Sequence, residues 1–172
     1  MLKNIILMLL MLTAATNASA QNINKQFYSR ITEQGYVYFV KPRKMPREGK
    51  AALKDLVFDI TCVSANDSAS FTATIITAQP IKDLNVTITT ADGQTRKAAL
   101  EHLFTDPEGH NFKNRVRFHM SMAEAEALYA ASASFKLTFE KGMSFAYPAG
   151  KWKKEQKIVP AIFSLYETNK HL

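Results

Sequence analysis

Two stretches rich in lysine and arginine are the first candidates for chemistry in this 172-residue chain. Residues 41–50 interleave cations with two prolines and a glycine, which predicts an exposed loop. Residues 151–157 place four lysines around a tryptophan. The proposed binding residues are Lys41, Arg43, Lys44, Arg47, Lys50, Lys151, Trp152, Lys153 and Lys154, with Lys157 beside them. If both segments share one end of the fold, they form a positive rim for an anionic polymer, a lipid headgroup or an envelope protein. The alternative is a pair of solvated segments that only maintain solubility.

Three aromatic residues offer a second kind of binding surface. Tyr147, Trp152 and Tyr36 could stack on sugar rings if their side chains are exposed. However, Tyr147 follows Phe145 on a face that the pattern predicts to be buried, and Trp152 could cap the core. We therefore favour structural roles for these side chains.

The densest group of possible metal ligands comprises Glu101, His102, Asp106, Glu108 and His110. These residues surround a proline and a glycine, which is typical of an ordinary polar turn. Their spacing matches no helical His-x-x-x-His pair or other metal motif, so we expect no metal and no other cofactor. A small hydrolase using His102 and His110 is a possible alternative function, provided that the two histidines converge in a pocket.

No residue has the sequence setting of an activated nucleophile. Gly-x-Ser-x-Gly is absent, and the single cysteine, Cys62, alternates onto the apolar face that holds Phe58 and Ile60. A thiol in apolar surroundings has a raised pKa and is inert. A lone cysteine also excludes an internal disulfide and a multi-cysteine zinc site. The sequence therefore indicates a protein that is not an enzyme.

The elements that must position these residues are mostly strands. Apolar and polar residues alternate with a period of two, which is typical of antiparallel sheets with one buried face. The predicted strands cover residues 36–40, 56–62, 71–75, 84–89, 115–120, 135–139 and 143–147, and Asp92-Gly93 predicts a hairpin turn. About seven strands favour a mainly β fold, an antiparallel β-sandwich that could be immunoglobulin-like.

Two helices interrupt the strand pattern. Ser121 and Glu124 have the spacing of a capping box, which predicts a helix from there to about residue 131. Val159, Ile162, Phe163 and Tyr166 form an amphipathic stripe near the C-terminus, and Pro160 fits best in the first turn of that helix. Residues 97–104 fit either a short helix or a bulged strand.

Residues 1–20 have the pattern of a cleavable signal peptide. Lys3 is followed by an uncharged apolar run and then by Ala18-Ser19-Ala20, which suits cleavage before Gln21. The run is shorter than the roughly 20 residues of a membrane span, and no cysteine is present there for lipoprotein acylation. We expect residues 21–172 to form one domain in the periplasm or outside the cell. Its charge, +7 for the whole chain, becomes about +6 once Lys3 is removed.

The sequence therefore predicts an exported, soluble, non-catalytic binding or adaptor domain that makes contacts through its basic segments. No nucleic-acid motif accompanies the positive charge, so nucleic acid is not an expected partner. Besides the hydrolase, a third hypothesis is a structural or assembly protein that acts through an edge strand.

Overall fold

A computed structural model describes residues 23–33, 35–82 and 84–170, and its elements are mainly strands. The predicted signal peptide lies outside the described residues. The strands are β1 (Phe27–Thr32), β2 (Gly35–Met45), β3 (Arg47–Glu48), β4 (Leu56–Val63), β5 (Ser68–Thr77), β6 (Asn85–Thr89), β7 (Thr95–Ala99), β8 (Glu101–Glu108), β9 (Asn111–Ser121), β10 (Lys136–Thr138) and β11 (Ser144–Ala146). The helices are α2 (Met122–Ala130) and α3 (Ala149–Asn169), and a short 3-10 turn covers Glu140–Gly142.

The strands form two antiparallel sheets. One has six strands in the order β1-β2-β4-β5-β9-β8, and the other has five in the order β3-β11-β10-β6-β7. The predicted mainly β sandwich is therefore confirmed. Its sheets hold more strands than the seven that the sequence pattern suggested and than the seven of a constant-type immunoglobulin domain.

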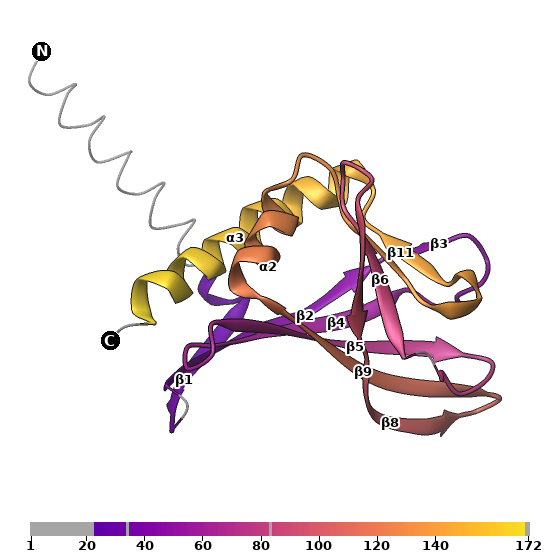
Figure 1. Ribbon diagram of the computed structural model, residues 1–172. Helices are drawn as coiled ribbons and strands as arrows, with labels where there is room; N and C mark the ends of the chain where they lie inside the picture. Colours follow the sequence, from indigo (N-terminus) through magenta and orange to yellow (C-terminus); the bar gives the residue numbers. More distant parts are fainter. Residues whose placement is uncertain (1–22, 34, 83, 171–172) are drawn as a thin grey trace, which may run out of the picture.

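Two groups of elements pack on the inner face of the six-stranded sheet. In Figure 1, α2 and α3 lie over one end of this sheet and the five-stranded sheet lies over the other. Phe58, Phe71 and Phe118 form a ladder across β4, β5 and β9, with ring centroids 5.9 and 5.2 Å apart. Such pairs each contribute about 0.5–1.5 kcal/mol beyond their buried area. One continuous hydrophobic cluster joins both sheets and both helices.

The two helix N-termini were predicted with different success. Ser121 and Glu124 form the predicted capping box, in which the Glu124 carboxylate accepts from the Ser121 backbone N–H at 2.8 Å. The predicted stripe of α3 is buried, as expected. The placement of Pro160 in the first turn was wrong. The helix begins at Ala149, after Pro148, so Pro160 lies in its interior.

Residues 97–104 form strands rather than a helix, but they belong to two strands of different sheets rather than to one bulged strand. β7 ends at Ala99, β8 begins at Glu101, and the pairing of β8 with β9 shifts register between His102 and Phe104. The turn predicted around Pro107 and Gly109 is the β8–β9 hairpin, although Pro107 itself belongs to β8.

Candidate functional site

The first basic segment is not a loop, so that prediction is corrected. Residues 41–45 complete β2, and Arg47 and Glu48 form β3. Pro42 is tolerated because the register of β2 against β4 shifts between Val40 and Arg43, where a ladder N–H is not required. Lys41, Lys44, Arg47 and Lys50 are exposed there.

The second basic segment forms the first two turns of α3. Lys151, Lys153, Lys154 and Lys157 lie on its exposed side. Trp152 faces inward and is only 1% exposed, with its indole N–H donating to the Ala131 carbonyl at 3.2 Å. Its ring stacks with Tyr129 and Tyr147, so Trp152 and Tyr147 are core residues, as we favoured. Trp152 therefore cannot be the exposed centre of a basic rim.

Arg43 on β2 forms a buried ion pair with α3 and so links the two basic segments. Its guanidinium donates two hydrogen bonds to the Glu155 carboxylate on α3, at 2.8 and 2.7 Å, and a third to Gln26. Both charged side chains are buried. Burial by itself lowers the pKa of Arg43, but its hydrogen bond and attraction to Glu155 outweigh this effect and raise it. Arg43 is thus a structural cation rather than part of an exposed rim.

The remaining cations of the proposed rim divide into two groups. Lys44 pairs with Asp55 at 3.5 Å, and Arg47 donates to the carbonyls of Ala52 and Leu53. Among the described residues, no salt bridge involves the exposed side chains of Lys41, Lys50, Lys151, Lys153, Lys154 or Lys157. The two segments lie on adjacent elements, because Arg43 reaches Glu155 and β3 pairs with β11 just before α3.

The histidines singled out from the sequence do not converge. His102 lies near the start of β8 and His110 in the turn after it, so about eight residues of extended chain, roughly 26 Å, separate them. Glu101 and Glu108 pair with Arg117 and Lys54. No group of three or more His, Cys, Asp or Glu side chains in the described part of the chain could hold a metal ion.

Cys62 is fully buried, and burial raises its thiol pKa to about 12, as the alternation of its strand predicted. At neutral pH the reactive thiolate is therefore scarce.

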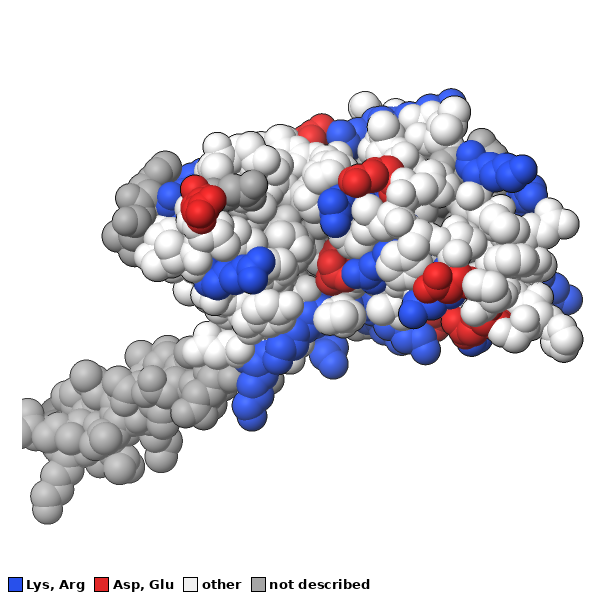
Figure 2. All heavy atoms as spheres, turned by 90° about the horizontal axis from the view of Figure 1, so that it is seen from below, with Lys and Arg blue, Asp and Glu red and all other residues white. Residues whose placement is uncertain are grey.

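The outer face of the six-stranded sheet carries mixed charge. Figure 2 looks onto this face and shows Lys and Arg side chains beside Asp and Glu over its middle. Arg115 on β9 pairs with Asp59 on β4 and donates to Thr74 at 2.7 Å. Because these cations have acid partners, the middle of this face is not a surface for anions.

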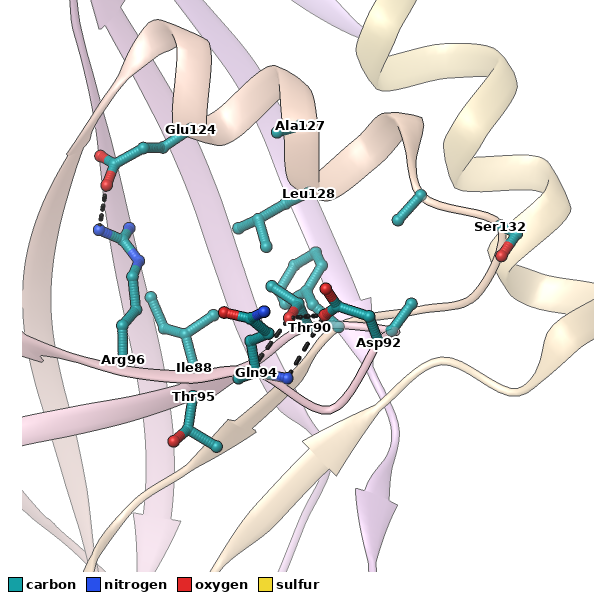
Figure 3. Close-up of a pocket in the computed structure, with 13 residues that line it drawn as sticks. Ile88, Thr90, Asp92, Gln94, Thr95, Arg96, Glu124, Ala127, Leu128 and Ser132 are labelled. Carbon is teal, nitrogen blue, oxygen red and sulfur yellow. Dashed lines mark hydrogen bonds and ion pairs between the residues drawn. The ribbon is translucent and has the colours of Figure 1, made fainter.

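A hollow lies between α2 and the β6–β7 hairpin and is one of the two larger hollows formed by the described residues. Its volume is about 640 Å³, within the range of ligand pockets. The apolar part is supplied by Ile88, Phe135, Leu128, Ala127 and Ala131. Figure 3 shows Ile88 and Leu128 between two polar ends, with Arg96 and Glu124 at one end and the Thr90–Gln94 turn at the other.

Arg96 supplies an unused donor at the first polar end. Its Nη1 donates to Glu124 Oε1 at 2.5 Å. Its Nη2 is shielded from solvent, and no described group accepts a hydrogen bond from it. Glu124 is held in turn by the Ser121 backbone N–H, which is the main reason why its pKa lies below the usual range. A buried donor without an acceptor is costly, so a turn of the partly exposed Arg96 side chain toward a ligand acceptor would be favoured.

The second polar end is the predicted Asp92-Gly93 turn. Gly93 has φ +84°, a left-handed conformation that favours glycine. Asp92 accepts from the Thr90 hydroxyl, the principal cause of its lowered pKa, and from the Gln94 backbone N–H. The hollow therefore contains two carboxylates, Asp92 and Glu124, against one guanidinium. This balance disfavours an anionic ligand.

Neither a family model, a curated protein nor a solved structure matches the chain. No helix among the described residues has the length and apolar character needed to cross a membrane. The hollow was missed by the sequence reasoning, which identified Ser121, Glu124 and the Asp92-Gly93 turn separately but had no signal that the helix and the hairpin meet.

Proposed function

We propose that the chain is an exported, non-catalytic binding domain whose ligand lies between α2 and the β6–β7 hairpin. The ligand class is a small, uncharged, mainly apolar molecule that carries a carbonyl acceptor. The observation that carries the proposal is Arg96 beside the apolar wall of the hollow: its Nη2 lacks an acceptor, and because the side chain is 36% exposed it can turn to present this donor to a ligand. The apolar body of the ligand contacts Ala127, Leu128 and Ala131, and its carbonyl accepts from Arg96.

The hollow has no net positive charge, which favours an uncharged ligand over an anionic one. Asp92 and Glu124 would repel a carboxylate, whereas an amide offers the same acceptor without the charge. We therefore choose 3-phenylpropanamide as the probe and 3-phenylpropanoate as its charged counterpart. Affinities of such small probes are expected to be weak, so backbone amide shifts in NMR titrations are the suitable readout.

Two pairs of variants make the titration specific. Ala127→Leu places a larger side chain into the hollow from the exposed side of α2, and Ala123→Leu makes the same change outside the hollow. Arg96→Met removes the donor, and Arg117→Met removes an equally exposed arginine from the other sheet. We expect Ala127→Leu and Arg96→Met to weaken binding of the amide and the two controls to leave it unchanged. Equal affinity in all four variants would refute the proposed site.

Export itself is tested by the mass of the protein recovered from cells. Cleavage after Ala20 gives a chain that begins at Gln21. A cell-associated protein that retains residues 1–20 would contradict this part of the proposal.

A second candidate function is contact with an anionic envelope surface. It is favoured by the exposed lysines at 151, 153, 154 and 157, which lie together on the first turns of α3 without acidic partners among the described residues. Such a surface strengthens association with anionic polymers or lipids in a salt-dependent manner.

A further inference from the structure

In the described part of the chain the sheets end in four edge strands, and three of them are protected against pairing with another chain. β8 contains Pro107, a register shift and several acidic side chains. β3 is only two residues long, and β7 carries Arg96 and Lys97 within its five residues. Proline, bulges, charge and short length are the usual means of preventing edge-to-edge association.

β1, the remaining edge, has a different character. Its sequence, Phe-Tyr-Ser-Arg-Ile-Thr, contains no proline, no lysine and no bulge, and all six residues pair in register with β2. Tyr28 is 58% exposed and Ile31 is 72% exposed. These are among the most exposed large apolar side chains in the described part of the chain. In Figure 1, β1 lies at one end of the six-stranded sheet.

The hydrogen-bond phase of β1 shows which backbone groups are available. The Lys41 N–H donates to the Gln26 carbonyl at 2.8 Å, which makes this cross-strand pair a hydrogen-bonded one. Because hydrogen-bonded and non-hydrogen-bonded pairs alternate in antiparallel sheets, Tyr28 and Arg30 also direct their backbone groups toward β2. Phe27, Ser29 and Ile31 therefore direct their N–H and C=O groups outward.

We propose that β1 pairs antiparallel with β1 of a second copy of this chain, about a twofold axis at Ser29. This register joins the outward-facing groups of Phe27, Ser29 and Ile31 through about six backbone hydrogen bonds. It places Phe27 opposite Ile31 of the second copy, so apolar side chains meet on one face. Tyr28 lies opposite Arg30 of the second copy on the other face, where a cation–π contact can form.

Contacts of Tyr28 and Arg30 within one chain support this register. Tyr28 stacks on Phe39 with ring centroids 4.9 Å apart, and the Arg30 guanidinium lies 5.1 Å from the centre of the Phe39 ring. Pairing would therefore extend an existing aromatic and cationic cluster across the axis. The neighbouring register, centred on Arg30, brings the two Arg30 side chains together and forms about four backbone hydrogen bonds. It is disfavoured on both counts.

The proposal is tested by sedimentation equilibrium of the purified protein in its processed form, over a range of concentrations. We expect a concentration-dependent dimer that Ile31→Lys converts to a monomer. Leu84→Lys is the matched control, because Leu84 is also 72% exposed and lies far from β1, immediately before β6 of the other sheet. A wild-type monomer at every concentration, or a dimer unaffected by Ile31→Lys, would overturn the proposal.

Cysteine crosslinking tests the register independently. Opposed residues in a hydrogen-bonded pair have Cα atoms about 5.5 Å apart, a distance that a disulfide can bridge. We expect oxidation to crosslink Ser29→Cys efficiently and Arg30→Cys poorly, while the native Cys62 is buried and stays unreactive. Preferential crosslinking of Arg30→Cys would contradict the register. Both experiments are independent of the ligand hollow, which lies on other strands.

Discussion

The buried Arg43–Glu155 ion pair gives a quantitative test of how α3 is held on the sheet. We consider the replacement of each partner alone, Arg43→Met and Glu155→Met, and of both together. Each single change leaves one charge buried without its partner, because the Arg43 and Glu155 side chains are only 8% and 10% exposed. Removing one partner of a buried pair typically costs about 3–5 kcal/mol.

The double replacement should cost much less than the sum of the two single replacements. Two methionines fill similar volume and leave no charge to desolvate, and such exchanges are often neutral. We therefore expect a coupling free energy of at least about 3 kcal/mol from the double-mutant cycle. This is a substantial part of the roughly 5–15 kcal/mol by which domains are stable, so urea unfolding resolves it.

An exposed ion pair provides the control. Lys54 and Glu108 approach to 2.9 Å, but their side chains are 60% and 43% exposed. The same cycle at this pair should give a coupling of about 0–1 kcal/mol. A coupling at Arg43–Glu155 as small as that of the control pair would refute the inference that this contact fixes the helix.

Four further predictions concern other parts of the molecule. Because burial raises the pKa of Cys62 to about 12 from an ordinary value of 9.0, its contribution to stability is fully present below pH 9.0 and is lost as the pH rises toward 12. The free energy of unfolding should fall by about 1.4 kcal/mol per pH unit over this range. In urea unfolding, Cys62→Ala should therefore lose stability less steeply with rising pH than the wild type. An identical decline in both proteins would contradict this prediction. Ser121→Ala removes the cap of α2 and should destabilise the fold by about 1 kcal/mol, whereas Ser132→Ala, after the helix, should have little effect. The pKa of Glu124 is lowered chiefly by the Ser121 backbone N–H. The ionised carboxylate of Glu124 therefore contributes to the free energy of unfolding at neutral pH, and this contribution is lost as the pH falls through the lowered pKa. Finally, replacing Lys151, Lys153 and Lys154 with glutamine should weaken sedimentation with phosphatidylglycerol vesicles at low salt, and unchanged binding would remove the anionic-surface candidate.

Local chemistry made much of the fold predictable. The strands around Phe58, Phe71 and Phe118 follow from strict alternation, because a period of two places those side chains on one face. The capping box at Ser121 identified the start of α2 for the same local reason. β1 was not recognised, because its apolar residues fall on both faces and leave no alternation to detect.

The errors arose where tertiary structure outweighed a local signal. Pro42 and the nearby Pro46 indicated a loop, but the register shift after Val40 accommodates Pro42 within a strand. Pro160 indicated a helix start, but the packing of Trp152 and Glu155 begins α3 at Ala149 instead. Burial of Arg43 required its partner Glu155, 112 positions later, which no local pattern reveals.

The hollow between α2 and the β6–β7 hairpin could not be predicted for a related reason. Arg96 is supplied by an edge strand and Glu124 by a helix that begins 26 residues after Arg96 in the sequence, at Met122, and only folding brings their side chains together. Their contact also explains why Arg96 is in place but incompletely paired, since Glu124 occupies Nη1 and leaves Nη2 without an acceptor.

The most direct test of the ligand hollow is a comparison of two probes that differ only in charge. NMR titration of the protein with 3-phenylpropanamide should shift backbone amides of α2 and of the β6–β7 hairpin. Titration with 3-phenylpropanoate should produce weaker binding at the same residues, because Asp92 and Glu124 oppose its charge. Tighter binding of the carboxylate, or amide shifts confined to other elements, would contradict the account.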